Sequence, residues 1–144
     1  MFIDKKELNS AIYEYQLTGI TPDDAIVQQA ILAAISEAIS YLNGKYDTQA
    51  IFSAEGEQRN PLVLEHCKSM AVWYLLRLSH ADVLYDKMKD YYTMAIDWFK
   101  AVAGITESGK TIAPDLPLKK DEEGDVLLKM RFGSRAKFSH GFDD

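Results

Sequence analysis

Apolar residues recur at three- and four-residue spacing over most of the first 104 positions, which predicts helices. The clearest helix is expected to have Thr21 as its N-cap and Pro22 at its first position, and Asn43-Gly44 is typical of a left-handed stop. Its predicted buried face carries Val27, Ile31, Ala34, Ile35, Ala38, Ile39 and Leu42. A row of small side chains permits close approach of another helix, within one subunit or between two: Ala30, Ala34 and Ala38.

A helix is predicted before this one and a loop after it. The first helix begins at Asp4, because D-K-K-E places a capping Asp three residues before Glu7, and it ends near Gly19. Its buried side is expected to carry Leu8, Ile12 and Tyr15. Residues 45–60 have neither helical nor alternating periodicity, so they predict a loop. We expect three apolar side chains to tuck under that loop: Tyr46, Ile51 and Phe52.

Two further helices are predicted after the loop. Asn60-Pro61 repeats the cap-plus-proline start signal, and the helix that follows should end at about Ser79. Its apolar stripe is Leu64, Cys67, Ala71, Tyr74, Leu75 and Leu78. The next helix should run from about Asp82 to Ala103 with the stripe Leu84, Met88, Tyr91, Tyr92, Ala95, Trp98, Phe99 and Val102.

These four helices predict an all-α fold, a small bundle of about four helices followed by an extended C-terminal arm. The predicted bundle domain covers residues 1–104, and residues 105–144 form a proline-containing linker and arm. Pro114, Pro117 and Gly124 favour a semi-extended course for residues 105–125, which would lead the chain away from the helices.

The stretch GITESGKT, residues 104–111, satisfies the phosphate-loop pattern G-x-x-x-x-G-K-[ST]. That motif works only between a buried strand and a helix whose N-terminus faces the phosphates. Here an aromatic helical pattern, WFKAVA, precedes it, and two prolines follow where the helix should start. We therefore interpret Gly104 as a helix C-cap and expect no nucleotide site.

Composition and charge narrow the class of protein. The chain has 144 residues, 47% of them hydrophobic, which suits one folded domain. The chain has a net charge of −6. Residues 1–118 account for all of it, because they contain 10 Lys and Arg against 16 Asp and Glu. A body this acidic is a poor partner for free DNA. The single Cys67, and the lack of an apolar leader or long apolar run, favour a soluble intracellular protein.

Candidate catalytic and metal-binding residues are few. His66 and Cys67 are adjacent, so on a helix their side chains point about 100° apart and cannot form a nucleophile–base pair. Cys67 is expected to be a buried core thiol. The three histidines lack the spacing of a zinc site, and the aspartates of residues 82–97 lie among lysines on an expected solvated face. We expect neither an enzyme nor a cofactor.

The end of the chain interleaves basic and aromatic side chains, and residues 126–142 contain no Asp or Glu. Such a segment can stack on bases and contact phosphates, can dock on an acidic protein surface, or can have no partner. Docking on a second copy fits the rings better, because burying each ring recovers about 1.5–3 kcal/mol. The candidate partner-binding residues are Lys129, Arg131, Phe132, Arg135, Lys137, Phe138 and Phe142.

Four segments together resemble a known family: ITPDDAIVQQAILAAISEAISYLNGKYD, NPLVLEHCKSMAVWYLL, YYTMAIDWFKAVAGI and RFGSRAKFSHGF, spanning about residues 20–142. Their order resembles the small head–tail joining proteins of Mu-like prophages, which are related in plan to the helical adaptor, or head-completion, proteins of tailed phages. The resemblance implies an α-helical subunit that joins a ring under the portal, extends the DNA exit channel and presents a surface for tail attachment. It carries over no catalytic residues.

The sequence thus favours a structural phage or prophage head–tail adaptor that acts by protein–protein assembly. Expected partners are copies of itself and portal or tail proteins, while DNA passes through a channel without specific binding. An acidic wall would repel DNA phosphates within a Debye length of roughly 8–10 Å. We expect the protein in the host bacterial cytoplasm and then at the head–tail junction of the virion, with no membrane and no small-molecule substrate.

Two rival functions come from other classes. A nucleic-acid-binding module would use the C-terminal arm directly on DNA, and its binding would weaken steeply with salt and vanish on Arg131→Ala and Arg135→Ala. A nucleotide hydrolase would use Lys110 and Thr111, and Lys110→Ala would abolish its ATP binding.

Overall fold

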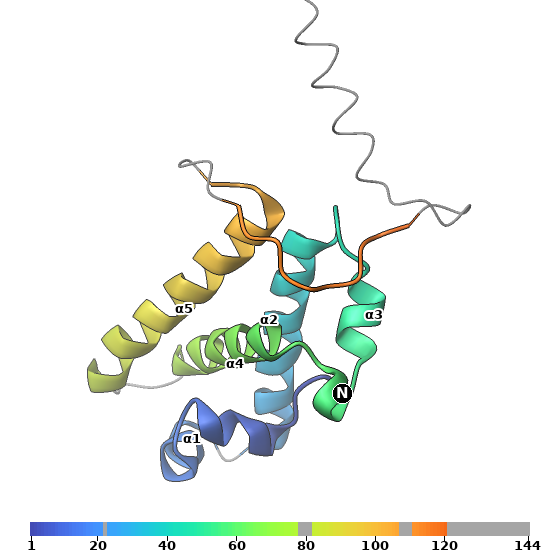
Figure 1. Cartoon of the computed structure of the whole chain (residues 1–144). Coiled ribbons are helices and arrows are strands. Elements are labelled where there is room, and N and C mark those ends of the chain that lie inside the picture. Colours follow the sequence, from blue (N-terminus) through green and yellow to red (C-terminus); the bar gives the residue numbers. More distant parts are fainter. Residues whose placement is uncertain (22, 78–81, 107–110, 121–144) are drawn as a thin grey trace, which may run out of the picture.

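A computed structural model of the chain describes residues 1–21, 23–77, 82–106 and 111–120 (Figure 1). These residues form an all-α bundle, which confirms the fold class predicted from the apolar periodicity. Within the described ranges there is no β-strand, only an isolated bridge between Tyr46 and Leu118. The helical elements in chain order are η1 Lys5–Ser10, α1 Glu14–Ile20, α2 Asp24–Leu42, α3 Thr48–Ser53, η2 Gly56–Gln58, α4 Pro61–Leu76 and α5 Asp82–Ala103, where η marks a 3-10 helix.

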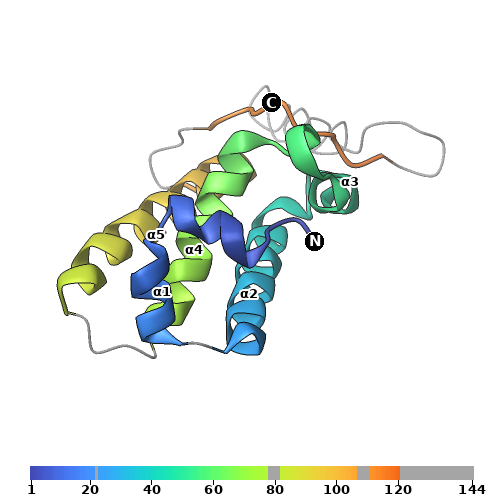
Figure 2. The same cartoon turned by 90° about the horizontal axis from the view of Figure 1, so that it is seen from below.

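Three long helices build the core. The central helix in the packing is α4, which contacts both α2 and α5, while α2 and α5 also contact each other. The 3-10 helix η1 packs against α2 and α4, so the N-terminal segment closes one side of the bundle (Figure 2). The largest fully buried side chains come from all of these elements and include Ile3, Leu8, Ile31, Met70 and Phe99.

The helix α2 carries the predicted buried face, but its start differs from the prediction. Asp23, not Thr21, is the N-cap, because the Asp23 carboxylate accepts a hydrogen bond from the Ala25 N–H at 2.9 Å. The Thr21 hydroxyl instead accepts from the Asp23 N–H at 3.1 Å, which holds the turn before the helix. The alanine row at 30, 34 and 38 is buried within this subunit.

By length and composition α2 is apolar enough to span a membrane, a test that the core helix of a bundle also passes. Seven of its residues are buried in this structure, so it acts here as a core helix. It ends at Leu42 without the left-handed residue expected at Asn43-Gly44, since neither of these residues has a positive φ.

The first predicted helix is broken in two, which corrects that expectation. The Glu7 carboxylate accepts from the Asp4 N–H at 2.9 Å, as the capping pattern predicts, but η1 ends at Ser10 and α1 starts only at Glu14. The break changes which side chains face inward. Leu17 is buried, whereas Tyr15, expected in the core, is 72% exposed.

The predicted loop over residues 45–60 contains two short helices, α3 and η2. Its apolar side chains tuck inward as expected, because Tyr46 and Ile51 are buried and Phe52 is half-buried. Asp47 is the N-cap of α3, because its carboxylate accepts a hydrogen bond from the Ala50 N–H at 3.1 Å. A helix of this length leaves too few apolar repeats for the periodicity to reveal it.

The boundaries of α4 and α5 agree well with the sequence. The Asn60 side chain accepts from the Leu62 and Val63 N–H groups at 3.0 and 3.1 Å, which confirms the predicted start of α4. After α5, Gly104 has φ of 78° and the Ile105 N–H donates to the Lys100 carbonyl at 2.8 Å. This left-handed cap confirms the interpretation of Gly104 as the C-cap of α5.

Residues 111–120, called the strap below, lie across one end of the bundle (Figure 1). The Ile112 N–H donates to the Ala101 carbonyl at 3.2 Å, and the Asp47 N–H donates to the Pro117 carbonyl at 2.9 Å. Leu116 is only 8% exposed and belongs to the core. The expectation that residues 105–125 lead away from the helices is therefore wrong for the strap, because one apolar side chain and these backbone bonds hold it in place.

The domain division at residue 104 stays a prediction. Residues 121–144 lie outside the described residues, and with them the predicted partner-binding set of Lys129, Arg131, Phe132, Arg135, Lys137, Phe138 and Phe142.

Candidate functional site

A groove of about 510 Å³ lies between η1 and α1 on one side and α5 on the other. Residues of α4 line it between these two sides. The side chains that matter below are Tyr13, Gln16, His66, Met88, Tyr91 and Met94. We call this feature the Tyr/Met groove.

Large side chains of the Tyr/Met groove are exposed to solvent. Tyr13 is 68% exposed, Tyr91 42% and Met94 59%, whereas Ile12 and Met88 are buried beneath them. Tyr91 and Met94 lie three residues apart on α5 and so share a face of that helix. Tyrosine and methionine are enriched at protein–protein interfaces, and methionine adapts readily to different partners. This surface therefore has the composition of a protein contact site.

The exposure of Tyr91 corrects its assignment to the buried stripe of the last helix. The sequence also missed Tyr13, because it lies in the break between η1 and α1 that the unbroken helix did not anticipate. A tyrosine at a helix-period position, such as Tyr15 or Tyr91, is compatible with burial or with contact to a partner, and the apolar periodicity does not separate the two.

His66 lies in the groove with its ring packed on aromatic side chains. Its ring centroid is 4.9 Å from that of Trp98 and 6.1 Å from that of Phe99. Burial lowers the pKa of the His66 imidazole, with the nearby Glu65 carboxylate opposing that effect. The ring is therefore neutral near pH 7 and acts here mainly as a flat apolar surface.

Cys67 is fully buried in the core, which confirms its expected role as a core thiol. Burial raises the pKa of this thiol well above its usual range, so the protonated form is favoured. It cannot serve as a nucleophile for the groove, because no part of it is accessible there.

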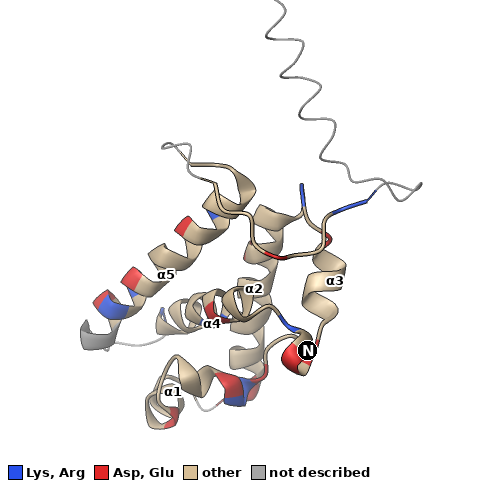
Figure 3. Ribbon diagram, in the orientation of Figure 1, with Lys and Arg blue, Asp and Glu red and all other residues tan. Residues whose placement is uncertain are grey.

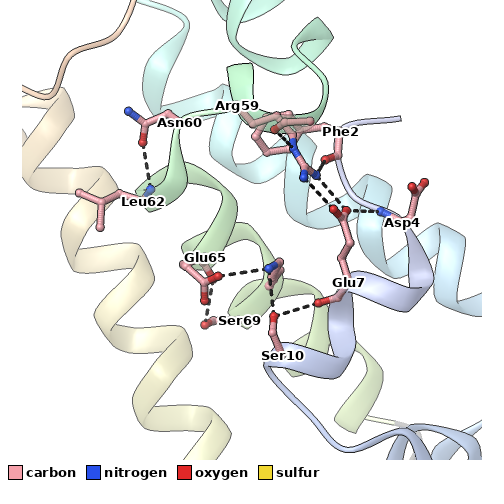
Figure 4. A network of polar contacts seen from close by, with 11 residues as sticks. Phe2, Asp4, Glu7, Ser10, Arg59, Asn60, Leu62, Glu65 and Ser69 are labelled. Atoms are coloured by element: carbon pink, nitrogen blue, oxygen red, sulfur yellow. Dashed lines mark hydrogen bonds and ion pairs between the residues drawn. The ribbon is translucent and has the colours of Figure 1, made fainter.

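Two basic side chains, Arg59 just before α4 and Lys68 within it, fasten η1 and so hold the groove wall (Figure 4). Arg59 makes a two-point ion pair with Glu7, at 2.7 and 2.9 Å, and its guanidinium also donates to the Phe2 carbonyl at 2.8 Å. The hydrogen bond from Arg59 lowers the pKa of the Glu7 carboxyl. Two-point pairing fixes the orientation of both groups, so η1 has one position on the bundle.

The buried Lys68 makes the second tie. Its ammonium group donates to the Ser10 hydroxyl at 2.9 Å and to the Glu65 carboxylate at 3.1 Å. The Lys68 side chain is 8% exposed, so these two acceptors replace most of its water. The tie links α4 to the last residue of η1, directly beside the groove.

Glu37 joins the three long helices on another part of the bundle. Its carboxylate accepts a hydrogen bond from the Tyr92 hydroxyl at 2.7 Å and another from the Tyr74 hydroxyl. Burial, and then these hydrogen bonds, raises the pKa of Tyr74 to about 12 and that of Tyr92 further. Trp73 stacks on the Tyr92 ring at 5.4 Å, so the group is enclosed by aromatic side chains.

This Glu37 cluster was not predicted, although the sequence holds a signal for it. Glu37 is the one charged residue in positions 25–42, which otherwise form an apolar helix. Each oxygen of the Glu37 carboxylate accepts one phenol hydrogen bond, so we interpret the cluster as a structural tie between α2, α4 and α5.

The other predicted sites can be placed as far as the structure describes them. The phosphate-loop pattern starts at the C-cap Gly104 after a helix, not after a strand, and Thr111 is exposed in the strap, while Lys110 lies outside the described residues. Among the described residues no cluster of three or more His, Cys, Asp or Glu could hold a metal ion.

The charges on α5 follow the predicted solvated pattern. Asp86, Asp90 and Asp97 are exposed, and the exposed Lys87 and Lys89 lie between the first two of them (Figure 3). The acidic excess of the body is therefore not gathered on this helix.

No family model, curated protein or solved structure matches the chain.

Proposed function

We propose that this chain is a structural head–tail adaptor of a phage or prophage, a subunit that assembles below the portal by protein–protein contacts. The Tyr/Met groove carries the proposal, because it presents Tyr13, Tyr91 and Met94 to solvent on a rigid all-α body. Exposed apolar patches of this kind are typical of interaction sites. The helical body also agrees with the subunit that the resemblance to small head–tail joining proteins implies.

The polar groups beside the groove support a contact site in preference to a catalytic one. Glu65 is bonded to Lys68, and the neutral His66 is packed on Trp98. Lys68 also bonds Ser10, so these side chains hold the walls of the groove in place. Catalysis would need an acid and a base with separated pKa values aimed at one point. The arrangement instead favours rigid presentation of a surface.

The C-terminal arm supplies the second half of the proposed assembly. Phe132, Phe138 and Phe142 lie among four cations and can bury their rings in a neighbouring subunit or in the portal. A contact between two different surfaces of identical subunits is heterologous, and it closes into a ring when the rotation permits. DNA would then pass through the ring without specific binding.

The test combines the full-length protein with the purified portal protein of the same phage. We expect a complex in which several copies bind one portal ring, detected by light scattering and visible by electron microscopy as an added ring. Replacing Phe132, Phe138 and Phe142 together by Ala should weaken the complex at least tenfold. The exposed Leu62→Ala variant serves as control and should bind normally.

Two results would contradict the adaptor function. One is a full-length protein that fails to bind the portal at any ratio. The other is tight, steeply salt-dependent DNA binding that disappears on Arg131→Ala and Arg135→Ala, which would favour the nucleic-acid-binding alternative.

A further inference from the structure

We propose that a second copy of this chain docks on the outward face of α2 and inserts its Leu32 into a hollow between α2 and α4. This contact rests on the proposed adaptor function, because a subunit of a ring packs against its own copies, and it names the surface at which they join. Three observations carry it: an outward helix face without charge, the hollow on one flank of that face, and an exposed leucine on the other flank.

The outward face of α2 carries no charged side chain. Positions 25–42 contain one charged residue, Glu37, and its carboxylate is turned onto the hydroxyls of Tyr74 and Tyr92. The half-buried and exposed residues of this face, called the α2 face below, are Ala25, Gln29, Leu32, Ala33, Ser36 and Ser40. By contrast, α5 exposes aspartates and lysines (Figure 3). Because charged residues are depleted in the core of protein–protein interfaces, the α2 face has the composition of a covered surface.

A hollow of about 620 Å³ borders one flank of the α2 face. Its lining residues are Ile26, Gln29, Ala30 and Ala33 of α2, Tyr74 and Leu75 of α4, and Arg77. Leu75 is 1% exposed and Ala30 8%, so the hollow has an apolar floor. The Arg77 guanidinium lies 5.2 Å from the centre of the Tyr74 ring, and its Nε donates to the Tyr74 carbonyl at 3.3 Å. The cation is thus held against its own helix, and the floor can accept an uncharged apolar side chain.

The other flank of the α2 face presents large apolar side chains. Leu32 is 49% exposed. Met1 is equally exposed and lies one turn away, because the Gln28 side-chain amide donates to the Met1 sulfur at 3.0 Å. Successive residues of a helix point about 100° apart, so Leu32 and the hollow residue Ala33 lie on different flanks of one rigid helix. Leu32 therefore cannot fill the hollow of its own subunit, and the two features can meet only between subunits.

The relative direction of the two helices follows from these positions. Leu32 and Ala33 differ in height by only about 1.5 Å along α2. Two copies of α2 that face each other in the same direction bring unlike flanks together, so Leu32 of one copy meets the hollow of the other. Antiparallel copies would bring like flanks together, leucine beside leucine. A contact between two different flanks can be repeated from subunit to subunit around a ring.

The chemistry of the surface selects a second copy as the partner. Any charged group brought against the hollow and the α2 face would lose its water without gaining an opposite charge. The partner must therefore be uncharged over the same length. Of the three long helices, α4 exposes Glu65 and Arg77, and α5 exposes several charges, whereas α2 offers an uncharged face with a leucine at the right height. The α2 face is complementary to itself.

A membrane fits the α2 face less well. The helix is long and apolar enough to span a membrane, but seven of its residues are buried in the bundle. A helix that lies on a membrane surface typically combines several large apolar side chains with Lys or Arg beside them. The α2 face has one large apolar residue, Leu32, and the residues at the start of the helix are Asp23 and Asp24.

Photo-crosslinking of the full-length protein tests the contact. Benzoylphenylalanine replaces Leu32 or, as a matched control, Leu62, which is 51% exposed on α4 and lies outside the lining of the hollow. An equal mixture of unlabelled and heavy-isotope-labelled subunits shows whether a crosslink joins two chains. We expect position 32 to give a covalent dimer, with the crosslink mapped by mass spectrometry to residues 26–33 or 74–77 of the other chain. Position 62 should give no such product.

Substitutions measure the same contact without a probe. Leu32→Glu brings a charge to the apolar hollow, whereas Leu62→Glu is the matched change elsewhere; both sites are at the surface, so both variants should fold. We expect Leu32→Glu to weaken self-association at least tenfold, measured by sedimentation, and Leu62→Glu to leave it unchanged. Gln29→Lys places a cation at the hollow. A mixture of Leu32→Glu and Gln29→Lys proteins should associate more tightly than either variant alone, because the two new charges meet across the contact.

Four outcomes would overturn the proposal. They are crosslinks from position 32 that stay within one chain or map to other segments, equal effects of Leu32→Glu and Leu62→Glu, and no crosslinked dimer at the highest soluble concentration, both alone and with the portal protein. The fourth is binding to phospholipid vesicles that Leu32→Glu abolishes, which would assign the α2 face to a membrane.

These results differ from a failure of the adaptor function itself. Portal binding that persists while crosslinks from position 32 map elsewhere removes the α2 contact alone. A chain that self-associates through the α2 face without binding the portal removes the adaptor function alone.

Discussion

Single side chains fix how the helices of this bundle meet. Glu37 on α2 receives hydrogen bonds from Tyr74 on α4 and Tyr92 on α5, so one carboxylate joins three helices. Because the group is partly withdrawn from water, each hydroxyl that is removed leaves the carboxylate with less compensation for its lost hydration. The cluster should therefore set part of the stability of the fold.

Tyr92→Phe removes one of these hydrogen bonds while keeping the ring. We expect the free energy of unfolding to fall by about 1–2 kcal/mol, measured by urea denaturation at pH 7. Tyr91→Phe is the matched control on the neighbouring, exposed position and should change stability by less than about 0.5 kcal/mol. Equal effects of the two variants would contradict the role of the Glu37 cluster.

The same cluster predicts how stability depends on pH. Burial raises the pKa of Tyr74 and Tyr92 above the unfolded value of about 10, so the unfolded chain loses these protons first. Their contribution is thus fully present below pH 10, and the free energy of unfolding should decline as the pH rises from about 10 to 12. Tyr92→Phe should reduce the slope of this decline, and an unchanged slope would contradict the assignment.

Helix ends are settled by a few residues with special backbone roles. Asn60 starts α4 through its side chain, and Gly104 ends α5 because a residue without Cβ adopts φ of 78° without strain. Gly44 follows α2 in an ordinary conformation, with nothing within 4 Å of an added Cβ. The two glycines therefore look alike in the sequence, but only Gly104 has a backbone conformation that requires glycine.

Gly104→Ala should lower the free energy of unfolding by about 1–2 kcal/mol, because the added Cβ is strained at positive φ. Gly44→Ala meets no neighbour and should leave stability equal or raise it by up to about 1 kcal/mol, since alanine restricts the unfolded chain. Thermal denaturation of the two variants side by side measures the difference. Indistinguishable transitions would show that the cap after α5 has no such role.

At the scale of the whole molecule, the strap ties the far end of the chain to the bundle. It crosses from the end of α5 to the start of α3, and Leu116 inserts into the shared core. The arm therefore starts from a fixed point at Lys120, and the segment beyond it has a defined origin.

Leu116→Ala should lower the free energy of unfolding by about 2 kcal/mol, the lower end of the range for buried leucines, because the strap lies at the margin of the core. Hydrogen exchange at the Asp47 and Lys119 amides should also accelerate, since both bond across the strap. Leu62→Ala, at an exposed site on α4, should change neither measurement. A Leu116→Ala variant that behaves like Leu62→Ala would contradict the strap's contribution.

The apolar periodicity was sufficient to predict the all-α class, the buried face of α2 and both ends of α5, because these depend on neighbours within one helix. The Asn60 and Gly104 caps were likewise readable, since each acts on backbone groups a few residues away. The short helix α3 and the break before α1 could not be predicted from the sequence, because tertiary packing outweighs the weak local helix preference at those positions.

By itself, then, the sequence determined the three long helices, most of their inward faces and the basic, aromatic composition of the arm. Only the tertiary structure decided that Tyr13 and Tyr91 share one exposed groove, that Glu37 meets Tyr74 and Tyr92, and that Leu116 brings the strap back to the core. Local patterns report which side of an element is apolar, whereas contacts between residues 37 to 55 positions apart depend on how whole helices pack.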